Sequence, residues 1–507
     1  MATPAGNGAP GAAGPARPGG PPTAPGGTGQ GTALVVPGGT TATAPAATAT
    51  PATTPARPPA PRTPVALATG FGARLSHATR TAPGRLRIAG ALLATLTIAF
   101  GALTAWQLET RAQAADRVVG YSQPLSRDAA EIHRSLADAA TTSASGFLLA
   151  GAEPKAVRER YEADLRTASR LLSESAARTT STSPARDTLS ELNQQLPVYA
   201  GLVETARADN RQGIPLGGAY LRYASEQMQT VLLPAAARLR DIEDKELAKD
   251  YAEAESWPSA AYGLALVTLL ALVWVQRQLY RRTNRVFNIG LLGATAAILA
   301  GGLWLTTTGL TTSSALRRSD HDGATPLRAL NSARVDVLSA RLSENLHLVA
   351  RGSTGKYLTQ WDEATKRLAG TDGPDVRLAQ RKGSIPEAYR IGPAASAKPL
   401  EEAIAAYDQW RQRHDVAHAL EVDRADYDDA LKATVSDTDT TGTADAAFKQ
   451  ADEALERAAK AEQKLFTDAA EGTGNDLRIA AVAAAVLALV AAAAALRGLG
   501  RRLAEYR

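Results

Sequence analysis

Four long apolar runs constrain this chain more than any other feature of its sequence. They cover residues 88–106, 257–275, 286–305 and 479–496, and none of them contains a charged side chain. About 20 apolar residues are needed to cross a bilayer as a helix, in which every backbone polar group is bonded within the segment. The sequence therefore predicts an all-α membrane protein with four transmembrane helices.

Arginines beside these runs predict how the chain is threaded. They cluster before the first run, between the second and third, and after the fourth, whereas the other flanks carry mixed or acidic charge. Cationic flanks stay on the cytoplasmic side of a membrane. We therefore expect a multi-pass protein of the cell membrane with both termini in the cytoplasm.

These runs divide the chain into the following segments. We predict a cytoplasmic tail (1–86), four transmembrane helices (87–106, 257–275, 286–305, 479–496), two extracytoplasmic domains (107–256, 306–478), an arginine-rich cytoplasmic loop (276–285) and a short C-terminal tail (497–507). Residues 1–70 are almost wholly Ala, Pro, Gly and Thr. Such a segment cannot assemble a core, so the first tail should be a disordered tether.

One competing interpretation makes the first apolar run a cleaved signal peptide. Ala112, Gln113 and Ala114 form an A-x-A sequence before Ala115. Secretory signals usually begin within the first ~30 residues, however, whereas 87 residues precede this run. The match to a signal peptide is therefore weak.

Several kinds of chemistry are excluded by composition. The sequence has no cysteine, which rules out disulfides, a thiol nucleophile and cysteine-based metal centres. The net charge is only +5, and the basic residues lie beside the apolar runs instead of forming the extended stripe of a nucleic-acid-binding protein. No G-x-S-x-G elbow or phosphate-binding glycine loop occurs. We therefore expect no enzymatic activity, no cofactor and no nucleic-acid partner.

The two predicted extracytoplasmic domains begin with similar sequences. The first reads QPLSRDAAEIHRSLADAATTSASGFLLAGAE and the second TPLRALNSARVDVLSARLSENLHLVARGSTG. In each, a Pro-Leu pair opens a run whose apolar residues recur every three or four positions, the spacing of helices packed along a coiled-coil seam. Each domain is thus predicted to be an antiparallel bundle of about four helices, whose first and last members continue into the adjacent spans. The similarity indicates duplication of a span-bundle-span unit.

Glycine and proline mark the expected turns within the two bundles. In the first bundle they fall at residues 151–154, 179–184 and 212–217. In the second bundle, residues 369–399 and 435–442 should form long irregular loops. The second bundle is therefore expected to be the less regular of the two.

The layout and two segments of the sequence resemble known proteins. A helical bundle between two spans is the layout of the sensory modules of chemoreceptors and many sensor kinases. GLVETARADNRQGIPLGGAYLRYASEQMQTVLLPAAARL (201–239) and YDQWRQRHDVAHALEVDRADYDDAL (407–431) resemble segments of actinobacterial GlnX-type membrane proteins. The resemblance covers most of residues 85–507. It implies nutrient signalling between an amino-acid-binding lipoprotein outside the cell and the soluble serine/threonine protein kinase G inside, without implying particular ligand residues.

The turn around Gln212 is the first candidate binding site. Arg211, Tyr220 and Arg222 flank its glycine-rich break. Arginine and tyrosine suit a carboxylate or a partner's loop. A plain connection between helices is the alternative.

The predicted cytoplasmic loop is the second candidate. Its arginines are Arg277, Arg281, Arg282 and Arg285. They either hold the loop inside by contact with lipid phosphates or bind an acidic partner surface.

His414 and His418 are spaced like the zinc ligands of H-E-x-x-H metalloproteases. Asp415 replaces the glutamate of that motif, and no third ligand follows at a fitting spacing. We therefore expect a structural pair and no metal site. A zinc-dependent surface hydrolase is the weaker alternative.

Together these observations predict an integral membrane signal-transducing protein. It would relay extracytoplasmic nutrient status, through a binding lipoprotein, to a cytoplasmic serine/threonine kinase, and it could form a homo-oligomer. Only eleven residues follow Leu496, too few for a catalytic output domain. The alternative is a non-catalytic cell-envelope scaffold or a transport accessory subunit.

The predicted threading can be tested with single cysteines, because the native chain has no thiol. We expect an impermeant maleimide to label a cysteine at Gln212 in intact cells and to spare one at Thr283. Permeabilised cells provide the control, in which both positions should react. Labelling of Thr283→Cys alone in intact cells would contradict the orientation.

Overall fold

The computed structural model of the chain describes residues 82–149, 153–283, 288–351, 355–435, 442–470 and 473–504. These residues form helices and short connections, with no β-strand among them. The all-α fold predicted from the sequence is therefore confirmed. The predicted N-terminal tail up to residue 81 and the arginine at position 285 lie outside the described residues.

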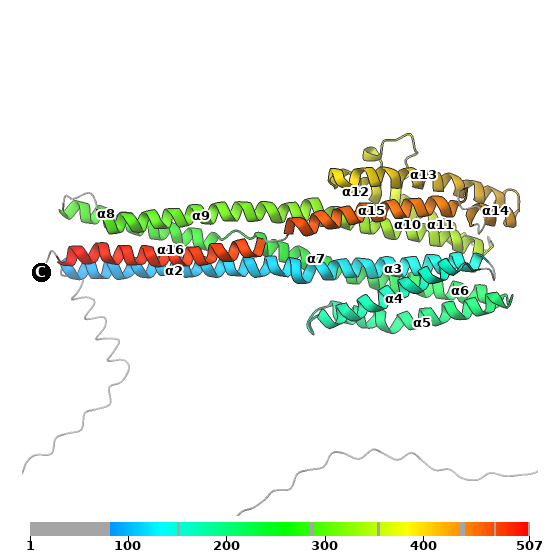
Figure 1. Cartoon of the computed structure of the whole chain (residues 1–507), viewed down its shortest axis with the longest axis horizontal. Coiled ribbons are helices and arrows are strands. Elements are labelled where there is room, and N and C mark those ends of the chain that lie inside the picture. Colours follow the sequence, from blue (N-terminus) through cyan, green and yellow to red (C-terminus); the bar gives the residue numbers. More distant parts are fainter. Residues whose placement is uncertain are drawn as a thin grey trace, which may run out of the picture. The chain divides into compact units, whose positions relative to one another are not determined.

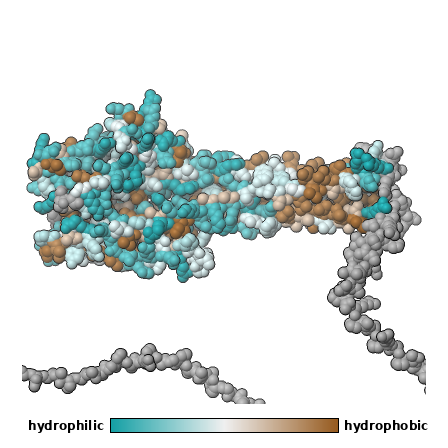
Figure 2. Space-filling model, turned by 180° about the vertical axis from the view of Figure 1, so that it is seen from behind, coloured by the Kyte–Doolittle hydropathy of each residue, from teal (hydrophilic) through white to brown (hydrophobic). Residues whose placement is uncertain are grey.

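Four helices contain the apolar runs and are long and apolar enough to cross a membrane. They are α2 (Ala82–Arg117), α8 (Ser259–Thr283), α9 (Ile289–Ser319) and α16 (Thr473–Ala504). Their inward-facing side chains form one apolar cluster that includes Phe100, Leu272, Ile298 and Ala495. Figure 2 shows hydrophobic side chains gathered on the surface of this end, whereas hydrophilic ones cover the opposite end. We call these four helices the span bundle.

The first bundle lies between the first two spans and has four helical rods. These are α3 (Gln123–Leu148), α4 (Lys155–Arg178), α5 (Ala185–Arg211) and the pair α6 (Leu216–Gln227) and α7 (Leu233–Glu255). The expected turn at 179–184 falls between α4 and α5, and the one at 212–217 falls between α5 and α6 except for its last two residues, which begin α6. The core includes Ile132, Leu172, Leu189 and Leu232, and Ile132 lies on the apolar face predicted for the helix after Pro124.

The second bundle lies between the last two spans. Its main helices are α10 (Thr325–Val349), α11 (Lys356–Ala369), α13 (Ala394–Val422) and α15 (Ala444–Ala470), with η4 (Leu378–Gln380), α12 (Ser384–Ile391) and α14 (Tyr427–Thr434) between them. The expectation of one irregular loop over residues 369–399 was partly wrong. Gly383 and Gly392 bound a short helix there, and Pro386 occupies its first turn, where a missing N–H costs nothing. Burial of Ile385 and Ala388 in the core stabilises this helix.

Each bundle is entered through a short π-helical segment. η1 (Val118–Ser122) joins α2 to α3, and η3 (Asp320–Ala324) joins α9 to α10. Both segments end two residues before a proline, Pro124 or Pro326. Proline has no backbone N–H to donate to the preceding turn, and the wider turn of a π segment accommodates the missing hydrogen bond. The same device at the same place in both halves supports the predicted duplication.

The last helix of the first bundle does not continue into the second span, contrary to expectation. α7 ends at Glu255, Ser256 adopts a ψ angle of 133°, and α8 begins at Ser259. Pro258 explains the break, because it lacks an N–H and disfavours helical backbone in the residue before it. The first and third spans, by contrast, run through their π segments into the bundles without interruption.

The two halves of the chain pack against each other from the bundles to the spans. α3 contacts α10 in the bundles, and α2 lies along α16 in the span bundle (Figure 1). Between these levels, α2, α7, α9 and α15 share one apolar cluster that includes Leu108, Tyr251, Leu316 and Phe466. The hydroxyl of Tyr251 lies 2.7 Å from that of Ser319 inside this cluster. A displacement between the bundles can therefore reach the spans through packed helices.

Close packing of α2 on α16 predicts the effect of enlarging Gly101. A Cβ atom there would overlap the Cβ of Ala488. We expect Gly101→Leu to destabilise the protein by about 1–3 kcal/mol, as overpacking does in other cores. The measurement is the melting temperature in detergent, with Gly263→Leu on an open face of α8 as the matched control. Equal melting temperatures for Gly101→Leu and Gly263→Leu would contradict the close packing of α2 on α16.

Candidate ligand site between the two bundles

Polar side chains concentrate where α3 and α4 of the first bundle face α10 and α15 of the second. We call this surface the seam. Two adjoining cavities lie along it, a larger one of about 510 Å³ and a smaller one of about 360 Å³. Asp138 and Arg160 line both cavities. The seam is therefore one continuous polar surface with space for a small molecule.

The helical repeat places pairs of charges on the seam. Residues four positions apart project from the same face of a helix. Three such pairs contribute: Arg134 and Asp138 on α3, Arg160 and Asp164 on α4, and Asp452 and Glu456 on α15. The faces that carry them turn away from the apolar cores of the two bundles and toward each other.

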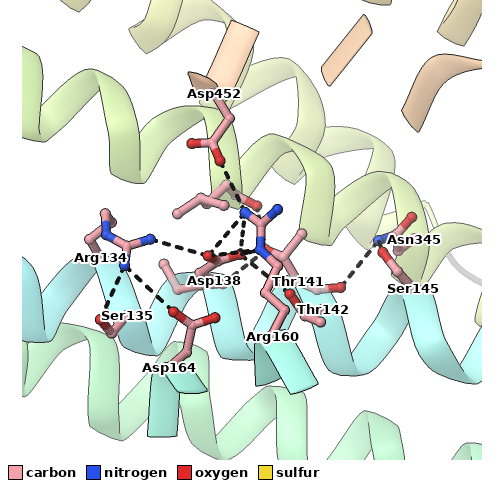
Figure 3. Close-up of polar contacts among 12 residues, drawn as sticks. Arg134, Ser135, Asp138, Thr141, Thr142, Ser145, Arg160, Asp164, Asn345 and Asp452 are labelled. Atoms are coloured by element: carbon pink, nitrogen blue, oxygen red, sulfur yellow. Dashed lines mark hydrogen bonds and ion pairs between the residues drawn. The ribbon is translucent and has the colours of Figure 1, made fainter. Parts of the chain in front are cut away.

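Arg160 joins the two bundles. Its guanidinium donates to Asp138 through Nε at 3.1 Å and Nη2 at 3.0 Å, and to Asp452 through Nη2 at 3.0 Å. Asp138 also accepts a hydrogen bond from Arg134 Nη1 at 3.1 Å. Figure 3 shows Arg160 between the two carboxylates, one from each bundle. Because the side chain of Asp138 is only 4% exposed, these charge-assisted bonds are weakly screened.

Burial raises the pKa of two carboxylates on the seam, Asp164 and Asp452. Burial raises the pKa of Asp164 to about 8, the nearby Asp138 acts in the same direction, and Arg134 and Arg160 oppose them. Asp164 Oδ2 has no hydrogen-bond partner among the described residues. Burial and Asp138 also raise the pKa of Asp452. At neutral pH the seam therefore favours a proton on Asp164.

Arg334 of α10 is the least satisfied cation on the seam. Its side chain is 12% exposed, and its closest ion-pair partner is Glu131 at 3.9 Å, from Nη1 to Oε2. Arg334 Nε has no hydrogen-bond partner among the described residues. Burial and the neighbouring Arg134 lower the pKa of Arg334. A buried guanidinium in this state gains free energy from any anion that reaches it.

Neutral hydrogen bonds complete the contact between the bundles. Asn345 Nδ2 of α10 donates to Ser145 Oγ of α3 at 2.7 Å, and Thr141 Oγ1 of α3 donates to the carbonyl of Leu338 at 3.0 Å. The smaller cavity adjoins these residues, and its other walls include the apolar side chains of Val157 and Phe448. The seam thus combines charged, neutral polar and apolar surface.

The residues predicted around the Gln212 turn lie elsewhere. Arg211 ends α5 and is exposed, Tyr220 is half-buried in α6, and Arg222 is exposed two residues further along the same helix. In the turn between these helices, Gly213 has a φ of 69°. None of the three residues lines either seam cavity. Their role as a binding site stays a prediction.

The predicted arginine-rich loop is mostly helical. α8 continues to Thr283, so Arg277, Arg281 and Arg282 belong to its last turns, and the first two are exposed. Arg285 lies outside the described residues. The exposed Arg87 of α2 and Arg497 of α16 stand at the same end of the span bundle. The structure thus gathers cationic side chains from three separate parts of the sequence.

His414 is a buried member of a hydrogen-bond network in the second bundle. Its Nδ1 lies 2.9 Å from Glu344 Oε1, and its ring stacks on Trp361 with 3.8 Å between centroids. Glu344 also accepts hydrogen bonds from Trp410 Nε1 at 3.0 Å and Arg341 Nη1 at 2.5 Å. Burial opposes ionisation of Glu344, but Arg341 and His414 outweigh it and lower its pKa. His414 therefore has a structural partner in Glu344.

His414 and His418, the predicted histidine pair, are one helical turn apart on α13. The rings of His414 and His418 lie 6.2 Å apart. Among the described residues, no group of three or more His, Asp or Glu side chains has an arrangement that could hold a metal ion.

Sequence reasoning missed the seam as a site. The signal available was the four-residue spacing of opposite charges within alanine-rich helices, as in Arg134 and Asp138. That spacing is also typical of solvated helix faces. Only the packing of four helices shows that these particular faces meet.

The raised pKa of Asp164 predicts how stability varies with pH. An aspartate in an unfolded chain titrates near 3.9, so the folded state holds this proton more tightly. The resulting stabilisation is complete below about pH 4 and is lost as the pH rises through about 8. We expect the melting temperature of the native chain, relative to that of Asp164→Asn, to fall between pH 5 and pH 8.

Asp187→Asn, at an exposed position on α5, provides the control for this measurement. Its melting temperature should follow that of the native chain at every pH. Identical pH profiles for the native chain and Asp164→Asn would show that Asp164 does not titrate in this range.

Comparison with known families gives one match. Residues 114–252 match the family model described as Actinobacterial sensor domain. No curated protein and no solved structure matches the chain. The matched segment runs from the end of α2 to near the end of α7, so it contains the first bundle and its half of the seam. The matched segment is therefore similar to an actinobacterial sensor domain and lies next to helices long and apolar enough to span a membrane, which supports a signal-sensing role.

Proposed function

We propose that this chain senses extracytoplasmic nutrient status, in particular that of amino acids, and relays it to a cytoplasmic serine/threonine kinase. The observation that carries the proposal is helical continuity from the seam to the far end of the spans. α2, η1 and α3 form one helical path, and α9, η3 and α10 form another. Each path links seam residues, such as Asp138 or Arg334, to the arginine-rich end.

Signal transfer follows from the packing of these paths. Binding at the seam changes the free energy of one arrangement of the bundles relative to another, and a ligand acts only through such a difference. Helices in membrane sensors shift by about 1–2 Å in transitions of this kind. Because α2 packs along α16, a shift of one bundle against the other changes the contacts between the first and last spans.

The π segments are suitable places for such a shift. Each has wider turns than the helices it joins, and π segments often occur at functional sites. In η3, a Cβ atom on Gly323 would come within 2.8 Å of the Cβ of Phe466. The segment therefore lies directly against α15, the helix that carries Asp452 to the seam.

An amino-acid-binding lipoprotein is the proposed partner at the Gln212 turn. Beside Arg211, Tyr220 and Arg222, this end of the first bundle exposes Leu216 and Tyr223 at 52% and 58%. Arginine and aromatic side chains are enriched in protein interfaces. The combination of cationic and apolar surface supports a docking role.

The kinase is the proposed partner at the arginine-rich end. Arg277, Arg281, Arg282 and Arg285 lie in a part of the chain that has no acidic residue between Glu255 and Asp320. Unbalanced positive charge favours an acidic partner surface and speeds its association. Anionic lipid is the competing ligand for the same arginines.

The relay requires no catalysis by this chain, and we propose a non-enzymatic role. The alternative, a cell-envelope scaffold or transport accessory subunit, predicts co-purification with envelope or permease components in place of a kinase. No feature of the seam favours that alternative.

The arginines at the end of α8 provide the test of the relay. Replacing Arg281 and Arg282 together by glutamine should weaken kinase recruitment about tenfold, since the charge that attracts an acidic surface is removed. Recruitment is measured by in-cell crosslinking from the end of α8. Arg281→Lys with Arg282→Lys is the matched control, because it keeps the charge that determines topology. Unchanged recruitment by the glutamine variant would contradict docking at this site.

A further inference from the structure

The larger seam cavity has lining charges that face each other across open space. Five basic and five acidic side chains line it, so its formal charge is balanced. Its volume of about 510 Å³ falls within the ~300–1,000 Å³ typical of ligand pockets. A balanced site of this size suits a small neutral molecule that carries both charges better than it suits an ion of either sign.

We propose that this cavity binds a free amino acid directly, with the carboxylate on Arg334 and the ammonium on Asp452 and Glu456. The inference rests on the proposed sensing function and names the ligand class of its site. It concerns the bundles themselves and requires no lipoprotein.

Arg334 provides the anion-binding end. Its closest carboxylate oxygen, on Glu131, is 3.9 Å away, beyond hydrogen-bond distance, and its Nε is unbonded among the described residues. A guanidinium presents its donors as a planar fork that binds a carboxylate through two parallel bonds. Its nearest cationic neighbour, Arg134, repels it. A ligand carboxylate would satisfy the donors and reduce this repulsion.

Asp452 and Glu456 provide the cation-binding end. They project from one face of α15 and line the cavity with Arg334. Both attract Arg334 electrostatically, but neither forms an ion pair with it. Asp452 is bonded among the described side chains only to Arg160, through Oδ2, which leaves Oδ1 for a second donor. An ammonium group has three donors and can bridge the two carboxylates.

The separation of these charges favours a molecule that carries both. Asp452 is paired with Arg160 at 3.0 Å and Glu456 with Lys460 at 2.6 Å, whereas the nearest carboxylate partner of Arg334 is 3.9 Å away. A zwitterion places an opposite charge beside each of them at once. A metal ion would meet only the acids, and the described residues contain no metal-binding group of three or more acidic or histidine side chains.

The adjoining smaller cavity offers a place for the ligand's side chain. It shares Asp138 and Arg160 with the larger cavity, and its walls include Thr142, Val157 and Phe448. Hydroxyl and apolar groups together accommodate a short or mixed side chain. The two cavities therefore divide ligand recognition into a charged part common to all amino acids and a part that selects among them.

Binding would act on the contact between the bundles. The ligand ammonium on Oδ1 of Asp452 would repel Arg160, which is bonded to Oδ2, and the ion pair between Arg160 and Asp452 joins α4 to α15. Weakening it frees one bundle to move against the other, which is the displacement that the relay requires.

The experiment uses the purified full-length chain in lipid nanodiscs, without any binding protein. Each of the twenty L-amino acids is titrated by calorimetry at pH 7. For an amino acid that binds, the carboxamide and the N-acetyl derivative are then titrated, since each lacks one of the two charges. We expect at least one amino acid to bind, and both derivatives to bind at least tenfold more weakly.

Two variants locate the site. Arg334→Gln and Asp452→Asn should each weaken binding at least tenfold, whereas Arg170→Gln, an exposed arginine of α4, should leave it unchanged. Because Asp452→Asn changes the opposite end of the cavity, it keeps the test informative if Arg334→Gln fails to fold. Arg334→Lys, which keeps the charge but not the fork, should bind with intermediate affinity.

Several outcomes would overturn the inference. These are the absence of binding by any amino acid, equal binding of the carboxamide or N-acetyl derivative, and native affinity in both site variants. The relay is tested separately by kinase recruitment. Loss of recruitment in the arginine variants without amino-acid binding would leave the relay standing and reject the direct site. Amino-acid binding by the native chain, together with unchanged kinase recruitment in the arginine variants, would support the direct site and reject the relay.

Discussion

The absence of water inside a bilayer is the constraint on which the rest of this structure depends. A backbone that crosses it must satisfy its own polar groups, and the helix does so within one segment. The hydrophobic effect does not hold such helices together in lipid, so close contact between small residues has to do so. In the span bundle, Gly101 lies against Ala488 and Gly290 against Gly498. Asn288 Nδ2 adds a hydrogen bond of 3.0 Å to the carbonyl of Gly498.

The predicted duplication would account for the two π segments at equivalent places, and divergence would account for the site. Aligning Pro124 with Pro326 superimposes η1 on η3 and places Leu136 opposite Leu338, both of them buried. The same alignment places Asp138 opposite Ala340 and Arg334 opposite Ile132. Leu136 and Leu338 are thus equivalent core residues, whereas the seam charges do not repeat, and Arg334 stands where the first bundle has the buried Ile132. The two bundles therefore share one asymmetric seam.

Two polar networks with opposite properties lie close together in the bundles. Around Glu344 both carboxylate oxygens have partners and a ring of Trp361 stacks on His414, so that among the described residues only Nε of Arg341 is left unbonded in the contacts of Arg341, Glu344, His414 and Trp410. On the seam, Asp164 Oδ2 and Arg334 Nε have no hydrogen-bond partner among the described residues. A satisfied buried network rigidifies its surroundings, while an incompletely satisfied one can gain free energy by rearranging or by binding. The second bundle is thus held firmly inside, and the contact between the bundles is left open to change.

The sequence by itself determined the features that depend on residues close together in the chain. The length and lack of charge of four runs specified the apolar helices, the apolar period specified the core faces of the bundles, and Pro124 and Pro326 marked where the helices enter the bundles. The same local rules explain two of the expectations that failed. Pro258 ends a helix that was expected to continue, and Pro386 begins one where a loop was expected.

Tertiary structure alone decided the seam, because its residues come from four helices far apart in the chain. Arg160 and Asp452 are separated by 292 positions, and their ion pair depends on how two bundles pack. Opposite charges four residues apart are equally suited to a solvated surface, so their spacing indicates a helix face without indicating its partner. Burial, which changes the pKa of Asp164 and leaves Arg334 short of partners, arises only when those faces meet.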